Sequence, residues 1–181
     1  MLRLELTGDA HLRLLEPGDA EELQALIAAN RDRLARWMGW AAEEDLEATR
    51  RFITLTRRQV ADDDGFQTAI VAGDRLAGMV GFHGVDWTHR KTSLGYWLGA
   101  EHEGRGLMTL AARALVDHAL GAWQLNRVEI RAAPENARSQ AVAERLGFTR
   151  EGTLRETDRA GDRYLDSVVF SLLASEWPRP G

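Results

Sequence analysis

A glycine-flanked arginine, Gly104-Arg105-Gly106, stands directly before a stretch whose apolar residues recur at the i, i+3, i+4, i+7 spacing of one buried helix face. A helix start offers unpaired N–H groups and partial positive charge, and glycines let that backbone approach an anion closely. The segment therefore predicts a phosphate site, although the bare pattern also fits a tight turn. It is not a Walker A loop, because no Gly-Lys-Ser/Thr follows, and Thr109 stands where a dinucleotide fingerprint needs its third glycine.

Composition bounds the class of protein. The chain has 181 residues, 44% hydrophobic and 28% charged, so we expect one globular domain over 1–181. It has no cysteine, which excludes disulfides, thiolate nucleophiles and thiolate metal ligands. Its net charge of −5 argues against a nucleic-acid partner and is compatible with a positively charged amine or a basic protein. There is neither an apolar run of about 18 residues nor a signal-peptide core, so we expect a cytoplasmic protein without membrane contact.

The elements around the glycine turn are a strand at 94–98, a helix from Leu107 and a strand at 127–132, which together make a parallel crossover. Elsewhere the pattern is mostly hairpins, and the order predicts an α+β fold whose mixed, largely antiparallel central sheet is flanked by helices. We expect further strands at 2–6, 11–15, 66–72, 76–82, 149–156 and 164–173, a helix opened by a capping box between Asp19 and Glu22, and helices at 43–60 and 137–147.

Several motifs occur in an order that resembles a known family. Gly95-Tyr96-Trp97-Leu98 followed by Glu103-Gly104-Arg105-Gly106 resembles the acyl-CoA-binding motif of the GNAT (Gcn5-related N-acetyltransferase) superfamily, Gln/Arg-x-x-Gly-x-Gly/Ala, with Glu101 standing where Gln or Arg is expected. Further matching segments are Leu34-x-x-Trp37-x-x-Trp40, 125–130, Asn136-x-x-Ser139, 144–148, 151–155 and 162–166. Together they resemble the RimJ/RimL branch of ribosomal-protein N-acetyltransferases, in particular the serine type.

The resemblance implies a GNAT-like fold in which a splayed central strand pair binds acyl-CoA. It also implies transfer of an acetyl group from acetyl-CoA to a primary amine, the α-amino group of a protein N-terminus, by direct attack in a ternary complex. The same chemistry on a small amine, a polyamine or an antibiotic remains open, as does succinyl-CoA as donor. A non-catalytic acyl-CoA-binding module is the alternative from another class. Relatives commonly self-associate, so we expect a homodimer; the apolar strand at 168–173 is either shared between subunits or core.

The resemblance also assigns residues to the cofactor. Backbone N–H groups from His102 to Leu107 are expected to wrap the pyrophosphate, and a backbone N–H near Leu98 to stabilise the oxyanion. Asn136 is expected to hold the pantetheine chain, and Ser139 to donate to the leaving thiolate. As a residue type, Asn136 also suits the N-cap of the helix at 137–147. The expected cofactor-binding set is Leu98, His102, Glu103, Gly104, Arg105, Gly106, Leu107, Thr109, Asn136 and Arg138.

The acceptor amine must lose a proton before it attacks, and a carboxylate acting through water is the usual solution. The resemblance points to Asp158 as this base, and Glu156 shares its face if the strand continues through both. Trp37, Trp40 and His83 are expected to border the acceptor. Tyr96 is interpreted as a plain strand residue, and five scattered histidines without paired spacing predict no metal site.

Overall fold

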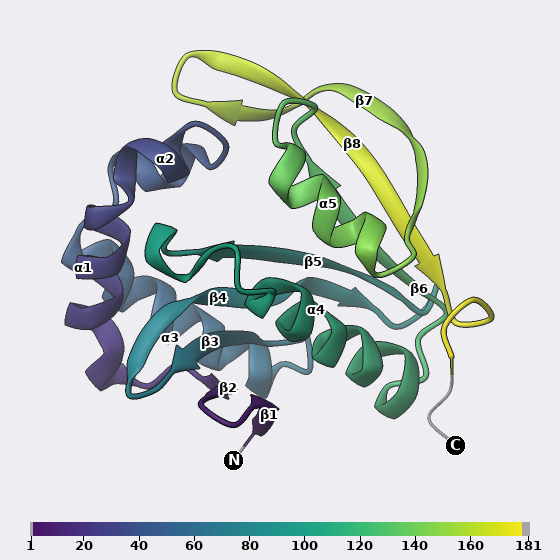
Figure 1. The fold of residues 1–181 in the computed structure, drawn as a ribbon, viewed down its shortest axis with the longest axis horizontal. Helices are drawn as coiled ribbons and strands as arrows, with labels where there is room; N and C mark the ends of the chain where they lie inside the picture. The colour runs from purple at the N-terminus through teal and green to yellow at the C-terminus, as the bar shows by residue number, and fades with distance from the viewer. Residues whose placement is uncertain (1, 179–181) are drawn as a thin grey trace.

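The computed structural model describes residues 2–178, and its centre is an eight-stranded sheet of order β1-β2-β3-β4-β5-β6-β8-β7 (Figure 1). Among the described residues, every neighbouring pair is antiparallel except β5 and β6. The predicted α+β class and its parallel crossover are therefore confirmed. The strands are β1 (Arg3–Thr7), β2 (Ala10–Leu14), β3 (Gln67–Ala72), β4 (Arg75–Asp86), β5 (Lys91–Leu98), β6 (Arg127–Ala132), β7 (Thr149–Ala160) and β8 (Arg163–Leu173).

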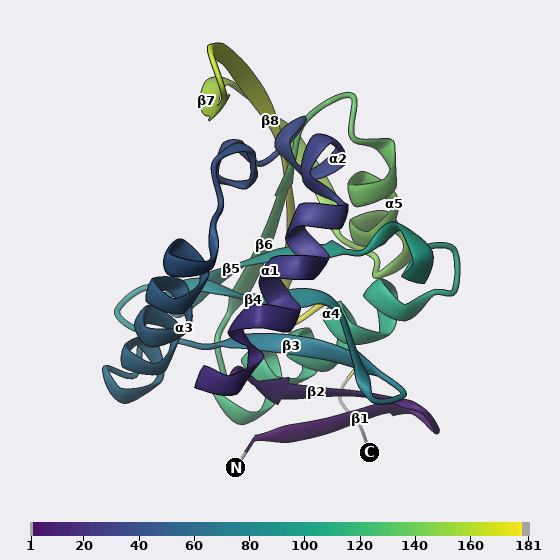
Figure 2. The ribbon, with the colours of Figure 1, turned by 90° about the vertical axis from the view of Figure 1, so that its left-hand side faces the viewer.

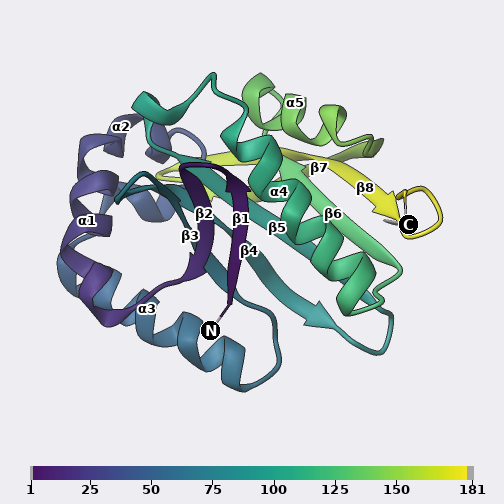
Figure 3. The same ribbon diagram turned by 60° about the horizontal axis from the view of Figure 1, so that its bottom comes forward.

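Helices cover both faces of the sheet. Helices α4 and α5 lie on one face, and α1 and α3 lie on the other (Figures 2 and 3). The α-helices are α1 (Ala20–Ala29), α2 (Arg31–Ala35), α3 (Leu46–Ala61), α4 (Leu107–Asp117) and α5 (Ala137–Arg145). Shorter helical turns are η1 (Pro17–Asp19), η2 (Gly39–Ala42), η3 (Ala100–His102) and the π-helical η4 (His118–Ala122).

Side chains alternate between two separate cores because successive strand residues point to opposite faces. In β3, Ile70 belongs to the core under α4 and α5, whereas Ala69 and Val71 belong to the core under α1 and α3. The same alternation sends Leu94 and Trp97 of β5 to different cores. The sheet is thus a wall between two packed layers, and each face carries its own set of side chains.

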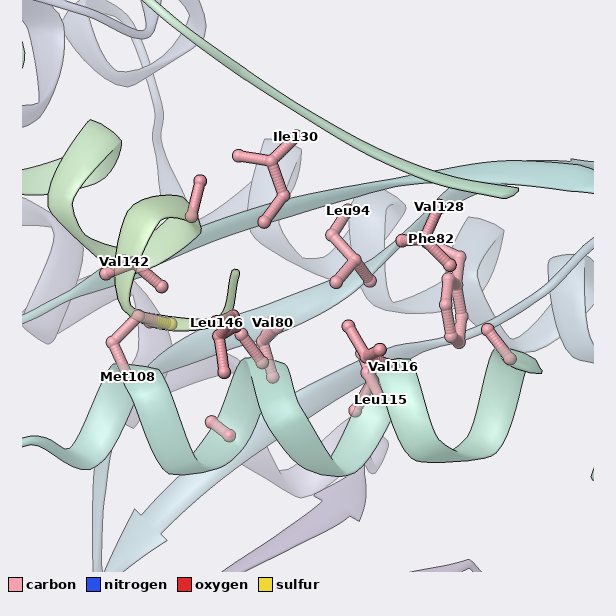
Figure 4. Close-up of a cluster of buried hydrophobic side chains, with 14 of the residues drawn as sticks. Val80, Phe82, Leu94, Met108, Leu115, Val116, Val128, Ile130, Val142 and Leu146 are labelled. Atoms are coloured by element: carbon pink, nitrogen blue, oxygen red, sulfur yellow. The ribbon is translucent and has the colours of Figure 1, made fainter. Parts of the chain in front are cut away.

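The core under α4 holds the glycine turn in place. Helix α4 buries an apolar face, with Ala111, Leu115 and Val116 fully inaccessible to solvent. The spacing from Leu107 placed Leu110 on this face, but Leu110 is 37% exposed and the buried face is turned toward Val116. Figure 4 shows this face packed toward the sheet, with α5 closing the same cluster. Because burial of such a face stabilises a helix far more than its propensity does, the start of α4 is fixed relative to β5.

The parallel pair β5–β6 separates along its length. Its register runs from Lys91↔Arg127 to Leu94↔Ile130, and no further pair follows in the described chain. Both strands nevertheless continue, β5 to Leu98 and β6 to Ala132. The two strands therefore diverge beyond Leu94 and Ile130, which is the splay expected of an acyl-CoA site.

Two local predictions need correction. The capping box lies three residues earlier than predicted, between Glu16 and Asp19, because the chain first forms the short turn η1. The carboxylate of Asp19 accepts from the backbone N–H of Glu16 at 2.7 Å and pairs with Arg13, and it makes no cap to α1. The predicted second helix also begins three residues later, with Asp45 as its N-cap.

The apolar C-terminal strand is an interior strand of the sheet. β8 pairs with β6 on one side and β7 on the other, and its Val168, Phe170 and Leu172 are buried in the core under α4. Of the two interpretations of this strand, the core one is confirmed, since its hydrogen-bonding edges are both occupied within the chain.

The strand that carries Glu156 and Asp158 is irregular. The β7–β8 register passes from Leu154↔Ser167 to Asp158↔Leu165, and Glu156 has a left-handed φ of 52°. The continuous strand that was expected to give both carboxylates one face is therefore interrupted by a bulge.

Among residues 2–178, no helix is long and apolar enough to cross a membrane.

A glycine in β4 tests how tightly β4 and β5 pack at the splay. A Cβ on Gly78 would lie 2.2 Å from the carbonyl oxygen of Trp97, a backbone atom that cannot swing aside. We expect Gly78→Ala to lower the free energy of unfolding by roughly 2–4 kcal/mol. Gly121→Ala is the control, because nothing lies within 4 Å of its Cβ position. Denaturant unfolding of both variants measures the difference, and equal stabilities would contradict the assigned packing.

Candidate active site

A pocket of about 1570 Å³ opens where β5 ends and α4 begins. Its walls come from α2 and the residues after it, the end of β5, the glycine turn, the first turn of α4 and the face of α5. Of the predicted site residues it brings together Trp37, Leu98, His102, Glu103, Gly104, Gly106, Leu107, Thr109, Asn136, Arg138 and Ser139. The residues it does not include are Trp40, His83, Arg105, Glu156 and Asp158.

The glycine turn has the conformation that anion binding needs. Gly104 and Gly106 have left-handed φ angles of 76° and 73°, which side-chain-bearing residues rarely adopt, and Gly106 is the N-cap of α4. The first N–H groups of a helix lack intrahelical acceptors, and those of α4 border the pocket. This cradle and the size of the pocket fit the phosphates and the long pantetheine arm of coenzyme A. Arg105 instead pairs with Asp9 at 3.8 Å.

Ser139 is held by two neighbours at the pocket. The side-chain oxygen of Asn136 caps α5 by accepting from the Ser139 backbone N–H at 3.2 Å, as the sequence predicts. The phenol of Tyr96 donates to the Ser139 carbonyl oxygen at 2.9 Å, and the Ser139 hydroxyl lies 3.3 Å from the phenol oxygen. Burial raises the pKa of Tyr96 to about 12, so the phenol stays protonated at neutral pH.

Tyr96 is a residue that sequence reasoning missed. It was interpreted as a plain strand residue, yet it spans from β5 to the first turn of α5 and lines the pocket. The sequence shows its place two residues before Leu98. The structure adds that Tyr96 lies just beyond the last β5–β6 pair. Arg33 and Arg145 also line the pocket and were not singled out, because the partners of a helix arginine are not visible in its own periodicity.

A second group of polar residues lies on the opposite face of the sheet. Val80 and Phe82 of β4 face the core under α4, so His83 faces the other way. Its ring lies against Gly95, where a Cβ would sit only 2.1 Å from Nε2, and its Nδ1 is 3.4 Å from the Ser93 hydroxyl. Gly95 is therefore required to make room for this imidazole.

The charges around His83 come from two other elements. Partial burial of the imidazole lowers the pKa of His83, and the positive charge of Arg131 lowers it further. The negative charge of Asp158 raises it. Asp158 also accepts a hydrogen bond from the Ser167 hydroxyl. On the face away from α4, His83 of β4 therefore interacts electrostatically with Asp158 of β7, and Asp158 is hydrogen-bonded to Ser167 of β8.

The remaining predicted acceptor-side residues are dispersed. Trp40 is 46% exposed and packs on Trp97 at a ring-centroid distance of 6.4 Å. Glu156 is exposed, and its backbone N–H donates to Asp166 at 2.9 Å. Trp40 and Glu156 therefore do not line the pocket.

Glu129 of β6 is the other carboxylate near the splay, and it is engaged in ion pairs. Although burial opposes the shift, hydrogen bonds from Arg127 and Arg131 hold the pKa of Glu129 below its usual value. Arg127 also pairs with Glu151 at 2.7 Å. A carboxylate bound by two guanidinium groups is a weak base, so Glu129 is a poor proton acceptor. Among residues 2–178, no group of three or more potential metal ligands is arranged to hold an ion.

The comparisons with known proteins agree on one class of enzyme, the acetyltransferases. The family model of the acetyltransferase (GNAT) domain matches residues 10–149. YdaF of Bacillus subtilis (strain 168), described as a candidate ribosomal N-acetyltransferase, is 41% identical over 168 residues, which is 92% of each chain. The ribosomal-protein-serine acetyltransferase of Escherichia coli (strain K12) is 27% identical over 175 residues, 94% of this chain and 96% of its own.

A solved structure agrees with these relatives. The microcin C7 self-immunity acetyltransferase MccE, crystallised with acetyl-CoA and AMP, has a TM-score of 0.88 and 27% identity over 93% of this chain and 94% of that one. The chain belongs to the GNAT acetyltransferase family, and the resemblance drawn from its motifs is confirmed. It is an acetyl-CoA-dependent N-acetyltransferase of the GNAT type.

The raised pKa of Tyr96 predicts how stability depends on alkaline pH. The folded-state value of about 12 exceeds the ordinary value of 10.0, so Tyr96 stabilises the fold fully below pH 10 and loses this contribution as the pH rises toward 12. We expect Tyr96→Phe to flatten the fall in unfolding free energy across that interval. Urea unfolding at several pH values measures the slope, and an unchanged slope would contradict the burial of this phenol.

Proposed function

We propose that residues 1–181 form one domain that transfers an acetyl group from acetyl-CoA to the α-amino group of a protein N-terminus, by direct attack in a ternary complex. The observation that carries this proposal is the divergence of β5 and β6 beyond Leu94 and Ile130. On one side of the sheet lies the pocket with its glycine cradle, and on the other lie His83 and Asp158. The opening between the strands is where a donor on one side meets an amine on the other.

The pocket residues would hold the donor. Backbone N–H groups from His102 to Leu107 bind its pyrophosphate, and the Asn136 amide binds along its pantetheine arm. A backbone N–H near Leu98 donates to the carbonyl oxygen on which negative charge develops. When bound, the thioester supplies an activated acetyl group whose leaving thiol has a pKa near 8.5.

Two side chains would handle the protons. Asp158 takes a proton from the incoming ammonium through water, which frees the nitrogen lone pair to form the new C–N bond. As the C–S bond breaks, Ser139 donates a hydrogen bond to the sulfur, and the second proton lost by the nitrogen passes through water to the thiolate. Tyr96 orients that serine. His83, beside Asp158, is placed to border the entering amine. Trp37 and Trp40 border the same acceptor from the segment after α2.

Two relatives support a protein acceptor. The name of YdaF refers to the ribosome, and that of the Escherichia coli enzyme refers to a serine of a ribosomal protein. A small-molecule amine is the second candidate, and it is favoured by the self-immunity function in the name of MccE. A ribosomal substrate would place the enzyme in the cytoplasm. A homodimer stays a prediction that sedimentation would test.

Replacing the base tests the mechanism. We expect Asp158→Asn to lower kcat by roughly a hundredfold or more, because the amine then has no carboxylate to take its proton. Raising the pH should recover part of this loss, since more of the amine is then already deprotonated. Calorimetry should show unchanged acetyl-CoA affinity, because Asp158 lies outside the pocket. Asp162→Asn, in the exposed turn before β8, is the matched control and should retain full activity. Full activity in Asp158→Asn would remove this residue from the chemistry.

An acceptor panel tests the substrate. Acetylation is followed by mass spectrometry on a short peptide with a free N-terminal serine, on the same peptide with its N-terminus blocked, and on spermidine. We expect acetylation only of the free peptide, at its α-amino group. Faster acetylation of spermidine would replace the protein acceptor by a polyamine, and acetylation of none of them with intact acetyl-CoA binding would favour a binding module.

A further inference from the structure

Three charged side chains that contact one another line the cofactor pocket. The carboxylate of Glu103, directly before Gly104, lies between the guanidinium groups of Arg33 and Arg138. Arg33 comes from α2, and Arg138 comes from the first turn of α5. Glu103 is thus an anion of the chain itself, held by two arginines beside the cradle that suits pyrophosphate.

Of the two arginines that contact Glu103, Arg33 is the one held in place by further hydrogen bonds. Arg33 Nη1 lies 2.5 Å from Glu103, and Arg33 Nη2 donates to Asn30 Oδ1 at 3.0 Å and to the Leu98 carbonyl oxygen. Asn30 is only 5% exposed, and its Oδ1 also accepts from the Ala100 N–H at 2.9 Å. A guanidinium fixed at several points loses little entropy in pairing, so Arg33 holds Glu103 firmly.

The contact with Arg138 is the weaker one. The Arg138 side chain is 81% exposed, against 33% for Arg33 and 23% for Glu103. Exposed ion pairs contribute little because solvent screens them and long side chains must be ordered. A diphosphate offers a guanidinium more charge and more acceptor oxygens than one carboxylate does. Arg138 can therefore change partners at small cost when a diphosphate reaches the glycine cradle.

We propose that Glu103 is a built-in competitor that lowers cofactor affinity by occupying Arg138, and that Arg33 retains Glu103 when the pyrophosphate takes Arg138 over. Arg33 is then a positioning residue on α2 that keeps the carboxylate away from the phosphates. The inference rests on the proposed function only through coenzyme A binding and not through the acceptor.

The test is the affinity of the purified protein for coenzyme A, measured by calorimetry without any acceptor. We expect Glu103→Gln to bind roughly fivefold more tightly, because Arg138 is released and a nearby negative charge is removed. Glu144→Gln is the matched control, since it removes an exposed carboxylate of α5, the helix that carries Arg138, outside the residues that line the pocket. We expect its affinity to stay within twofold of the unmodified protein. Equal gains in both variants would mean general electrostatics and would overturn the proposal.

Two further substitutions, each made alone and together with Glu103→Gln, examine the exchange of partners by Arg138. Arg33→Gln should bind coenzyme A more weakly, because Glu103 is then unrestrained, and adding Glu103→Gln should remove most of that loss. In an Arg138→Gln background, Glu103→Gln should gain clearly less than in the unmodified protein. A persistent loss in the Arg33/Glu103 double variant, or an undiminished gain without Arg138, would contradict the assigned roles.

Dephospho-coenzyme A identifies the phosphate concerned, since it keeps the pyrophosphate and lacks the 3′-phosphate. We expect Glu103→Gln to gain as much with this ligand as with coenzyme A, and a gain confined to coenzyme A would overturn the assignment to the pyrophosphate. The readout is independent of turnover. If no amine is acetylated but these affinities shift as expected, the proposed function fails and this inference stands.

Discussion

The molecule depends on one interrupted interaction, the parallel pairing of β5 and β6. From Lys91↔Arg127 to Leu94↔Ile130 the two strands are paired, and backbone hydrogen bonds make the sheet continuous. Beyond it the two strands carry backbone groups that no longer satisfy each other, and buried backbone groups need partners. An elongated ligand with amide groups can supply such partners. The pocket lies at this end of β5, where Tyr96, Trp97 and Leu98 line it beyond the last β5–β6 pair.

Periodicity and turn chemistry were sufficient to predict most of the fold. Alternation placed the strands at 67–72 and 127–132 almost to the residue, and helical spacing from Leu107 gave α4. The errors occur where two local signals compete. Asp19 suits an N-cap, yet its carboxylate is taken by Arg13 and by the Glu16 N–H, contacts that depend on a strand folding beside it. The bulge at Glu156 depends on how β7 meets β8, which the sequence of β7 alone does not specify.

The candidate site was predictable to the extent that it consists of backbone. The glycine turn and the Asn136 cap are local features with local signals, and both have the predicted geometry. Tyr96 and Arg33 were missed because their partners lie 43 and 65 to 70 residues away in the chain. No window of sequence shows that a phenol on a strand will contact a serine on a later helix. Long-range side-chain contacts of this kind require the fold before they can be seen.

The two cores lie on opposite faces of the sheet, and in the part of the chain that the structure describes they share no buried side chain. The layer of α4 and α5 shapes the donor pocket, while the layer of α1 and α3 supports the face that carries His83. Substitutions far apart that share no partners add independently in their effects on stability. Helix α3 can therefore be repacked with little effect on the cradle, whereas Asn30 and Arg33 tie α1 and α2 to the segment before it. Such modularity gives a chain of this design a route to new amines while it keeps one donor.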